Sequence, residues 1–179
     1  MSQFHGKFAA IDFETADAKR DSACAVAVVR VEEGVIVDKL YKLVRPPRST
    51  FSPFCVRVHN IHWRDVENEP VFADVWPEFA PLFHGVDFVA AHNASFDRSV
   101  LSACLSAAGM EQPMERFLCT VKLARKVWPD LKNHKLNTVS GHLGIQLQHH
   151  HAESDAEACA KIAIEALRIY PQLALPNML

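Results

Sequence analysis

The chain lacks long apolar runs, paired cysteine motifs and a strong excess of charge. The longest apolar run, near residues 23–29, is far too short to span a membrane, and the first seven residues lack the apolar stretch of a signal peptide. Five cysteines without a CxxC pair predict reduced thiols in a cytoplasmic protein. Repeats and low-complexity segments are absent apart from three consecutive histidines. At 179 residues and 49% hydrophobic content, one domain over residues 1–179 is expected.

Two acidic residues follow a short apolar run near the N-terminus. Residues 8–11 predict a strand that is buried on both faces. Because side chains alternate along a strand, Asp12 and Glu14 point to one side and Phe13 points to the core. Two carboxylates about 4 Å apart repel each other by about 4 kcal/mol at an effective dielectric near 20. Bound Mg²⁺ or Mn²⁺ would remove that repulsion, although two solvated acids at a strand end would explain the pair equally well.

Two further acids lie near the starts of predicted helices. Asp97 follows a predicted buried strand at residues 87–91 and lies in the first turn of the next helix. A favourable contact with the helix dipole, worth about 0.3–1 kcal/mol, would explain Asp97 alone. Asp155 lies near the start of the last predicted helix, five residues after His150. The ordinary pKa of histidine, about 6.5, suits a general base, but the run His149–His151 could also be a solvated turn or an adventitious metal binder.

Three motifs built from these residues carry a family resemblance. Asp12-Phe13-Glu14-Thr15, His92-Asn93-Ala94-Ser95-Phe96-Asp97 and His150-x-Ala152-x-x-Asp155 resemble, in order and spacing, the exonuclease motifs of one family. This is the DnaQ-like family of 3′–5′ exonucleases, in its DEDDh branch, which includes the epsilon subunit of bacterial DNA polymerase III and RNase T. Softer matches occur at residues 58–61, 119–120 and 134–139. The resemblance covers a core of about residues 7–168 and leaves a short C-terminal tail.

The order of predicted elements indicates an α/β fold. A hairpin is expected from residues 23–31 and 35–44, and further strands at 87–91 and 116–119. A proline-rich loop is predicted at 46–53. Besides the helix that carries Asp97, four helices are predicted: one that begins after Pro70, one at 120–128, one at 135–143 and one that begins near Asp155. This order suggests a mixed sheet with helices on its faces. The resemblance implies a ribonuclease H-like fold with five strands.

The resemblance also implies two-metal hydrolysis of phosphodiester bonds, with two Mg²⁺ or Mn²⁺ ions per site. Asp12, Glu14 and Asp155 would hold the ion that activates water. Asp12 would bridge to the second ion, which Asp97 would support directly or through water. His150 would take the proton of the attacking water. The products would be nucleoside 5′-monophosphates released from the 3′ end of DNA, or of RNA.

Substrate contacts are implied by the resemblance as well. The backbone near Thr15 and the side chains of His59 and Phe96 would flank the terminal nucleotide, although Phe96 could equally be a core residue. The net charge of −2 disfavours a long duplex-binding surface, so the expected footprint is a few nucleotides of a single-stranded 3′ end. Two small basic clusters could touch nucleic acid or form a solvated face: Lys122, Arg125 and Lys126, then Lys132, His134 and Lys135.

Other functions compete with a stand-alone DNA exonuclease. The chain could be a polymerase-associated proofreading or docking subunit, or an exoribonuclease of the same fold. Residues 172–176 resemble the start of a sliding-clamp-binding peptide, with Pro176 where phenylalanine is typical, but a helix exit explains them too. A third hypothesis is a histidine-rich protein that stores Zn²⁺ or Ni²⁺ through the histidine run, His134 and His142.

Overall fold

A five-stranded mixed sheet forms the centre of the molecule. The structure is a computed structural model that describes residues 5–112 and 116–174. The strands lie in the order β3-β2-β1-β4-β5: β1 (Lys7–Thr15), β2 (Ala23–Glu32), β3 (Val35–Leu43), β4 (Phe88–Ala91) and β5 (Phe117–Cys119). β2 runs antiparallel to β1 and to β3, whereas β1, β4 and β5 are parallel. The predicted mixed sheet of five strands is therefore confirmed.

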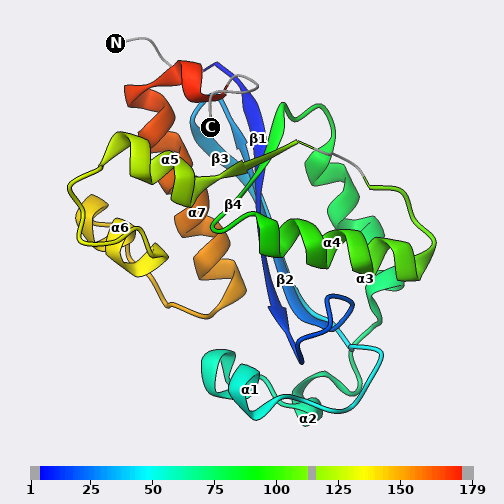
Figure 1. Ribbon diagram of the computed structural model, residues 1–179. Helices are drawn as coiled ribbons and strands as arrows, with labels where there is room; N and C mark the ends of the chain where they lie inside the picture. The colour runs from blue at the N-terminus through cyan, green and yellow to red at the C-terminus, as the bar shows by residue number, and fades with distance from the viewer. Residues whose placement is uncertain (1–4, 113–115, 175–179) are drawn as a thin grey trace.

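Helices cover both faces of this sheet (Figure 1). Their bounds are α1 (Pro53–His59), α2 (Trp63–Val66), α3 (Phe72–Phe79), α4 (Ser95–Ala108), α5 (Thr120–Val127), α6 (Leu136–Leu143) and α7 (Ala152–Ile169), with 3₁₀ turns η1 (Ala80–Phe83) and η2 (Pro171–Ala174). Figure 1 shows α5, α6 and α7 on one side and α3 and α4 on the other. The short helices α1 and α2 lie beyond the C-terminal end of β1.

The loop predicted at residues 46–53 ends in a helix that the sequence pattern did not indicate. Pro53 occupies the first turn of α1, where its missing N–H costs nothing. α1 has only seven residues and none of them is buried, so its apolar residues do not repeat over enough turns to predict a helix. The hairpin, in contrast, forms where it was expected, because Glu33 and Gly34 both take positive φ angles in the turn.

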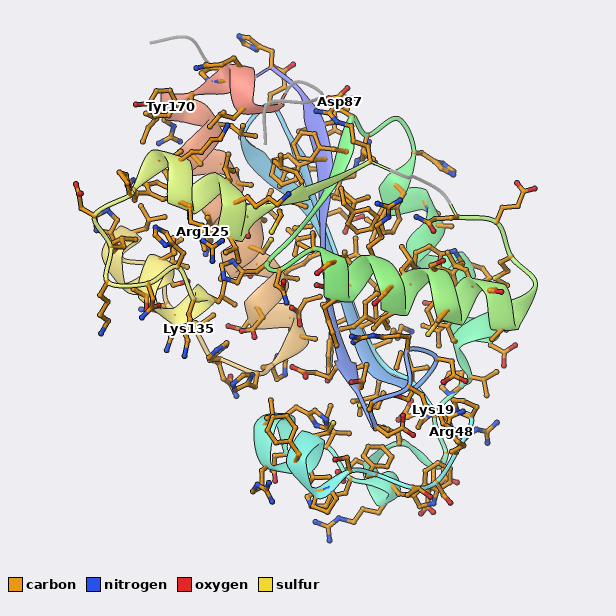
Figure 2. The ribbon with its side chains drawn as sticks, viewed as in Figure 1. Lys19, Arg48, Asp87, Arg125, Lys135 and Tyr170 are labelled. Atoms are coloured by element: carbon orange, nitrogen blue, oxygen red, sulfur yellow. The ribbon has the colours of Figure 1, made fainter. Side chains whose placement is uncertain are left out.

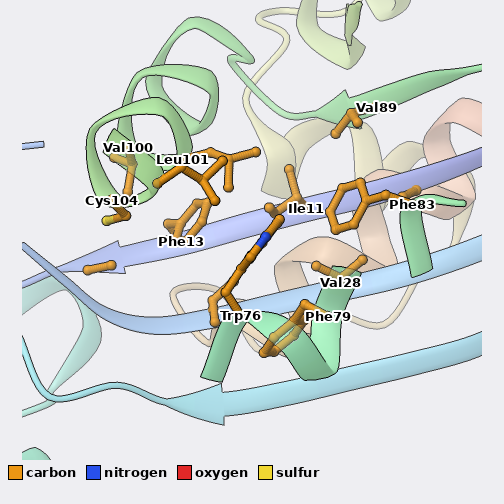
Figure 3. Close-up of a cluster of buried hydrophobic side chains, with 14 of the residues drawn as sticks. Ile11, Phe13, Val28, Trp76, Phe79, Phe83, Val89, Val100, Leu101 and Cys104 are labelled. Carbon is orange, nitrogen blue, oxygen red and sulfur yellow. The ribbon is translucent and has the colours of Figure 1, made fainter. Parts of the chain in front are cut away.

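The face of the sheet under α3 and α4 is packed with large side chains (Figure 3). Ile11 and Phe13 point from β1 into this layer, where they join Trp76 and Phe79 of α3 and Leu101 of α4. The rings of Trp76 and Phe79 stack with centroids 6.3 Å apart. Aromatic side chains each bury about 150–250 Å², so this layer supplies much of the apolar burial.

Next to the acidic residues, the opposite face of the sheet meets α7 through small side chains, whereas Phe8 and Phe88 fill the other end of this face. The alanines buried at this contact are Ala10, Ala25, Ala27 and Ala90 of the sheet, and Ala156, Ala160, Ala163 and Ala166 of α7. Without bulky groups between them, the helix can pack close to the strands. The start of α7 thereby lies beside the C-terminal end of β1, which is the position that the acidic motifs require.

Across residues 5–112 and 116–174, no helix is both long and apolar enough to cross a membrane.

Candidate active site

Three carboxylates meet where β1 ends and α7 begins. Asp12 and Glu14 extend from the row of β1 residues that faces α7, and Asp155 lies in the first turn of α7. Oxygen atoms of all three lie within 4.8 Å of one another. Glu14 is only 8% exposed and Asp155 only 4% exposed. Segments more than 140 positions apart in the chain (12 and 155) therefore form one buried acidic cluster.

The fourth predicted acid reaches the same strand from the other side. Asp97 lies in the first turn of α4 and is 2% exposed. Its Oδ1 accepts a hydrogen bond of 3.1 Å from the backbone N–H of Phe13, the residue between Asp12 and Glu14. Within the described part of the chain, Asp97 does not belong to the group whose oxygens lie within 4.8 Å. The arrangement is one compact trio with a fourth carboxylate anchored beside it.

Burial raises the pKa of all four acids, and repulsion between carboxylates adds to it for Asp12, Glu14 and Asp97. Burial, followed by the charges of Asp97, Glu14 and Asp155, raises the pKa of Asp12 well above its ordinary value. Burial is also the largest cause for Glu14 and for Asp97, and the pKa of each rises to about 8. The pKa of Asp155 is raised by burial, against the opposing hydrogen bond from His150. Without a cation, the cluster therefore tends to hold protons at neutral pH.

Asp155 shows which kind of group the cluster lacks. Its Oδ2 is held by Nδ1 of His149 at 3.1 Å and by the backbone N–H of His150 at 3.0 Å. Its Oδ1 is buried and has no hydrogen-bond partner, a condition that only one other side-chain oxygen or nitrogen shares in residues 5–112 and 116–174. An unpaired buried carboxylate oxygen is costly, and a hard divalent cation would supply the missing partner. The donor set thus fits a divalent metal ion.

His150 lies directly before α7, as its spacing to Asp155 predicts. Its backbone has φ +67°, a conformation that is uncommon for residues other than glycine. Its exposed ring stacks on the ring of His149, with centroids 3.8 Å apart. Burial, and then the charge of His149, lowers the pKa of His150. A lowered pKa keeps the imidazole neutral near pH 7, which is the form that can accept a proton.

A cleft of about 540 Å³ opens beside the carboxylates. Its acidic side is formed by Asp12, Glu14 and Asp155, with His149 and His150 at the rim. Its other lining residues are Phe13, His92, Asn93, Val121, Arg125, Asn133, His134, Lys135 and Leu136. The carboxylates therefore share one cleft with two permanent cations, Arg125 and Lys135.

The sequence model of an exonuclease family, the RNase T exonucleases, matches residues 9–163. The chain belongs to this exonuclease family. The match spans most of the chain and includes all three acidic motifs, so the predicted membership is confirmed.

The chain is similar over most of its length to two bacterial exonucleases. The chain is 35% identical over 178 residues to the 3′-5′ exonuclease DinG of Bacillus subtilis, covering 96% of this chain but 19% of DinG. It is 35% identical over 147 residues to exodeoxyribonuclease 10 of Escherichia coli, covering 79% of this chain and 60% of that protein. The chain thus spans only part of these relatives.

Solved structures share the same fold. Exonuclease X in complex with 5′ overhanging duplex DNA has a TM-score of 0.73 and 30% identity, covering 92% of this chain and 93% of that one. The nuclease domain of 3′hExo, a DEDDh family member, has a TM-score of 0.78 at 18% identity, covering 93% and 94% of the two chains. The predicted ribonuclease H-like fold of this exonuclease is confirmed.

The residues predicted to flank a nucleotide, Thr15, His59 and Phe96, are not among the residues that line this cleft, and their polar atoms are largely engaged. The N–H of Ile61 donates to Nδ1 of His59 at 3.0 Å, so the proton of this ring is on Nε2 and faces the Thr15 carbonyl at 3.1 Å. Burial lowers the pKa of His59, which agrees with a neutral ring. Phe96 is half-buried, packs against the core and carries the Arg20 guanidinium 4.7 Å from its ring centroid. Only the ring faces or edges of His59 and Phe96 are left for contact with a nucleotide.

A hydrogen-bonded chain through two histidines of the cleft lining was not predicted. Because the His134 carbonyl can only accept, Nε2 of His92 donates to it at 3.1 Å, and Nδ1 of His92 accepts from the Thr120 hydroxyl at 2.9 Å. Burial lowers the pKa of His92 to about 4, so this ring stays neutral. The His134 ring in turn donates to the Trp128 carbonyl at 2.9 Å. The softer motifs at 119–120 and 134–139 supplied the signal, since both contribute a partner to His92.

The histidine-rich storage site is not assembled. In the part of the chain that the structure describes, two clusters have ligand atoms within 4.8 Å of one another: Asp12, Glu14 and Asp155, and His149, His150 and Asp155. Neither contains His134, which bonds to Trp128, or His142, whose ring packs edge-on against Trp128. The predicted combination of these histidines with the histidine run is therefore wrong.

Proposed function

We propose that this chain is a metal-dependent 3′–5′ exonuclease that releases nucleoside 5′-monophosphates from the 3′ end of DNA. The observation that carries the proposal is the convergence of Asp12, Glu14 and Asp155 within 4.8 Å at the edge of a cleft. A scaffold or docking subunit would gain nothing from burying three carboxylates together, because their repulsion destabilises the fold. A hydrolytic site gains a pre-organised cation-binding centre.

Two Mg²⁺ or Mn²⁺ ions fit this chemistry best. Asp12, Glu14 and Asp155 would hold one ion, and Asp97, with Asp12, would support the other. A pair of ions about 3.5–4 Å apart stabilises the attacking and leaving oxygens of an in-line displacement. Mg²⁺ and Mn²⁺ prefer oxygen ligands, which supports their choice over ions that favour nitrogen or sulfur.

His150 is proposed as the general base. A neutral ring nitrogen of His150 would take one proton from the attacking water, whose oxygen then bonds to the terminal phosphorus. The bond from that phosphorus to the 3′ oxygen of the preceding nucleotide breaks, and this oxygen leaves as a 3′-hydroxyl after gaining a proton. The terminal nucleotide is released as a 5′-monophosphate, and the shortened strand carries a new 3′ end.

The basic wall of the cleft is proposed to bind the phosphates next to the scissile bond. Arg125 lies on α5 and Lys135 at the start of α6, on one side of the molecule (Figure 2). Both line the cleft that the carboxylates also line. Two cations account for a footprint of a few nucleotides, and the backbone of Thr15 with the rings of His59 and Phe96 would contact the last nucleotide.

DNA is the favoured substrate. The relative exodeoxyribonuclease 10 is 35% identical, and the exonuclease X structure that shares 30% identity is a complex with duplex DNA that has a 5′ overhang. A duplex of that shape has a recessed 3′ end, so recessed and single-stranded 3′ ends are both expected substrates. RNA remains the second substrate to be tested.

We further propose a single exonuclease domain over residues 1–179 that works in the cytoplasm. All five cysteines are free, as in proteins of reducing compartments. A polymerase contact stays a prediction, supported by 35% identity over 158 residues to a PolC-type DNA polymerase III of Oceanobacillus iheyensis, of which the chain covers 11%. The clamp-binding motif at 172–176 runs beyond the described residues at Leu175.

The decisive assay follows 5′-labelled single-stranded DNA, recessed duplex DNA and single-stranded RNA with Mg²⁺, Mn²⁺ or EDTA, using Asp12→Ala as the matched control. The expected result is a ladder that shortens from the 3′ end, needs the metal and is absent in Asp12→Ala. If RNA were degraded faster than either DNA, RNA would be the preferred substrate instead of DNA. No cleavage of any polymer by the metal-loaded protein would refute the exonuclease.

A further inference from the structure

We propose that His149, His150 and Asp155 form a second metal site, for a borderline transition-metal ion such as Zn²⁺, and that an ion held there inhibits the exonuclease. The inhibitory consequence rests on the proposed function, whereas the binding of the ion does not. The site shares Asp155 with the oxygen-lined cluster but takes its other two ligands from the histidine run.

The spacing of the ligand atoms already suits such an ion. One ligand atom from each of the three residues lies within 4.8 Å of the other two. Nδ1 of His149 is 3.1 Å from Oδ2 of Asp155. With Zn–N and Zn–O distances of about 2.0–2.2 Å, two ligands at a tetrahedral angle lie about 3.4 Å apart. A shift of a few tenths of an ångström would bring His149 and Asp155 to coordination distance, and the stacked ring of His150 would turn to direct a nitrogen at the same ion.

The backbone holds the two histidine rings together. His150 has φ +67°, and its N–H donates to Asp155 Oδ2 at 3.0 Å. Consecutive side chains would normally diverge, but this turn stacks the rings of His149 and His150 at 3.8 Å with an interplanar angle of 19°. His151 leaves in another direction and packs its ring against Tyr41 at 5.0 Å. Two of three consecutive histidines thus converge on one carboxylate, and the third does not.

A separate observation indicates that this carboxylate lacks a ligand. Asp155 is 4% exposed, lines the cleft, and its Oδ1 is buried without a hydrogen-bond partner. Rotation of the carboxylate, or bridging by its two oxygens, would let it bind an ion on the histidine side while leaving the oxygen-lined side. Asp155 is therefore the group for which two kinds of ion compete.

Ligand chemistry separates the two ions. Mg²⁺ gains little from imidazole, whereas Zn²⁺, Cu²⁺ and Ni²⁺ bind nitrogen ligands far more tightly in the usual order of divalent affinities. Two imidazoles and one carboxylate are a common ligand set for Zn²⁺ and leave one position for water. The ion would occupy the ring nitrogen with which His150 takes a proton and would withdraw Asp155 from the Mg²⁺ site. Inhibition should therefore weaken as the Mg²⁺ concentration rises.

The test compares Zn²⁺ inhibition and direct metal binding in three variants. His149→Ala removes a proposed ligand, His151→Ala is the matched control within the same histidine run, and Asp12→Ala removes the catalytic centre only. Inhibition is measured for the unmodified chain, His149→Ala and His151→Ala, as the Zn²⁺ concentration that halves each protein's own rate in Mg²⁺. Binding is measured by the visible absorption of Co²⁺ added to the protein without substrate, and circular dichroism checks that each variant is folded.

His149→Ala should need at least about tenfold more Zn²⁺ for half inhibition, since even outer partners of a metal site contribute about 10–100-fold to affinity. His151→Ala should behave like the unmodified chain. Asp12→Ala should keep the Co²⁺ absorption band although its nuclease activity is lost. Equal Zn²⁺ sensitivity and an unchanged Co²⁺ band in His149→Ala would overturn the site. A band that depends on His149 in a protein without any nuclease activity would support the site and refute the proposed function.

Discussion

The two faces of the central sheet are built from side chains of different size, and the difference separates stability from chemistry. Towards α3 and α4 the sheet packs on Phe13, Trp76, Phe79 and other large groups. Towards α7 it packs on Phe8 and Phe88 at one end and, next to the acidic residues, on alanines from both partners. Each aromatic side chain buries far more apolar surface than an alanine, so the aromatic layer contributes more to the free energy of folding than the alanine contact does. The alanines of the second face let α7 pack close to the sheet.

Strand β1 shows both functions in consecutive residues. Ile11 and Phe13 point to the aromatic layer, whereas Ala10 points to α7 and the carboxylates of Asp12 and Glu14 continue its row. Because the α7 face is lined by small groups, Asp155 at the start of α7 comes within ligand distance of that row. Substitutions on the two faces should therefore fail in different ways.

The largest expected effect is a loss of rate at Asp12, which its neighbour on β1, Ile11, should not share. Asp12→Ala should lower the rate by more than about 10⁴-fold, because it removes a ligand shared by both proposed ions and so exceeds the usual cost of losing a general base. Ile11→Val should keep the rate and lower the free energy of unfolding by about 0.5–1.5 kcal/mol. Single-turnover rates and urea unfolding measure the two quantities. Comparable rates for the two variants would contradict the separation.

The next effect concerns the histidines before α7. His150→Ala should lower the rate by about 10²–10⁴-fold and leave residual activity, because the carboxylate cluster is intact. His151→Ala, which loses only its contact with Tyr41, is the control. Mn²⁺ affinity, followed by electron paramagnetic resonance, should change little in His150→Ala. If His151→Ala lost as much rate as His150→Ala, the assignment of His150 as the general base would be wrong.

A larger side chain on the alanine face should damage the site from a distance. Ala160 is buried on α7 against the sheet, so Ala160→Leu should cost about 1–3 kcal/mol of stability through overpacking. A displacement of about 1 Å at a reactive geometry can cost about 10²-fold in rate. Leu101→Ala on the aromatic face should cost about 2–5 kcal/mol yet change the rate only a few-fold below its melting temperature. The reverse pattern would show that closeness of α7 is not what assembles the site.

The last expected effect is on the stability of the metal-free protein. The pKa values of Glu14 and Asp97 are raised to about 8, so between about pH 4 and 8 the folded state binds more protons than the unfolded state. Stability should therefore fall as pH rises through this range in EDTA, by about 2–4 °C in melting temperature per kcal/mol. Added Mg²⁺ or Mn²⁺ should reverse the fall.

Asp97→Asn should flatten this pH dependence, because it removes a carboxylate that must lose its proton in a buried place. Asp74→Asn, at an exposed position of α3 on the aromatic face, is the matched control and should leave the dependence as it was. Differential scanning calorimetry between pH 5 and about 8 would measure both. A melting temperature in EDTA that rises steadily over this range would contradict the sign argued from the buried acids.

The sequence was informative wherever local periodicity and chemistry agree. Alternation along β1 was enough to place Asp12 and Glu14 together with Phe13 opposite, and the spacing of five residues placed His150 at the start of α7. The apolar run before Asp12 was enough to predict that strand β1 is buried on both of its faces. The convergence of three segments needed the family resemblance, because no local pattern determines which strand ends lie near each other.

Other features could not be predicted because they depend on contacts across the fold. Helix α1 has no buried residue, so it leaves no periodic signal. The pairing of His149 with Asp155 depends on the positive φ of His150, which a residue other than glycine does not indicate. The bond from His92 to the His134 carbonyl spans 42 positions, so it becomes visible only when α5 and the following loop are packed against β4.

Anomalous diffraction from crystals grown with Mn²⁺ would test the central claim most directly. The account predicts one ion bound by Asp12, Glu14 and Asp155, in contact with the oxygen of Asp155 that now lacks a partner. A second ion should lie about 3.5–4 Å away, on the side of Asp97. Anomalous density elsewhere, with the three carboxylates turned away from one another, would contradict the assignment of this cluster as the catalytic centre.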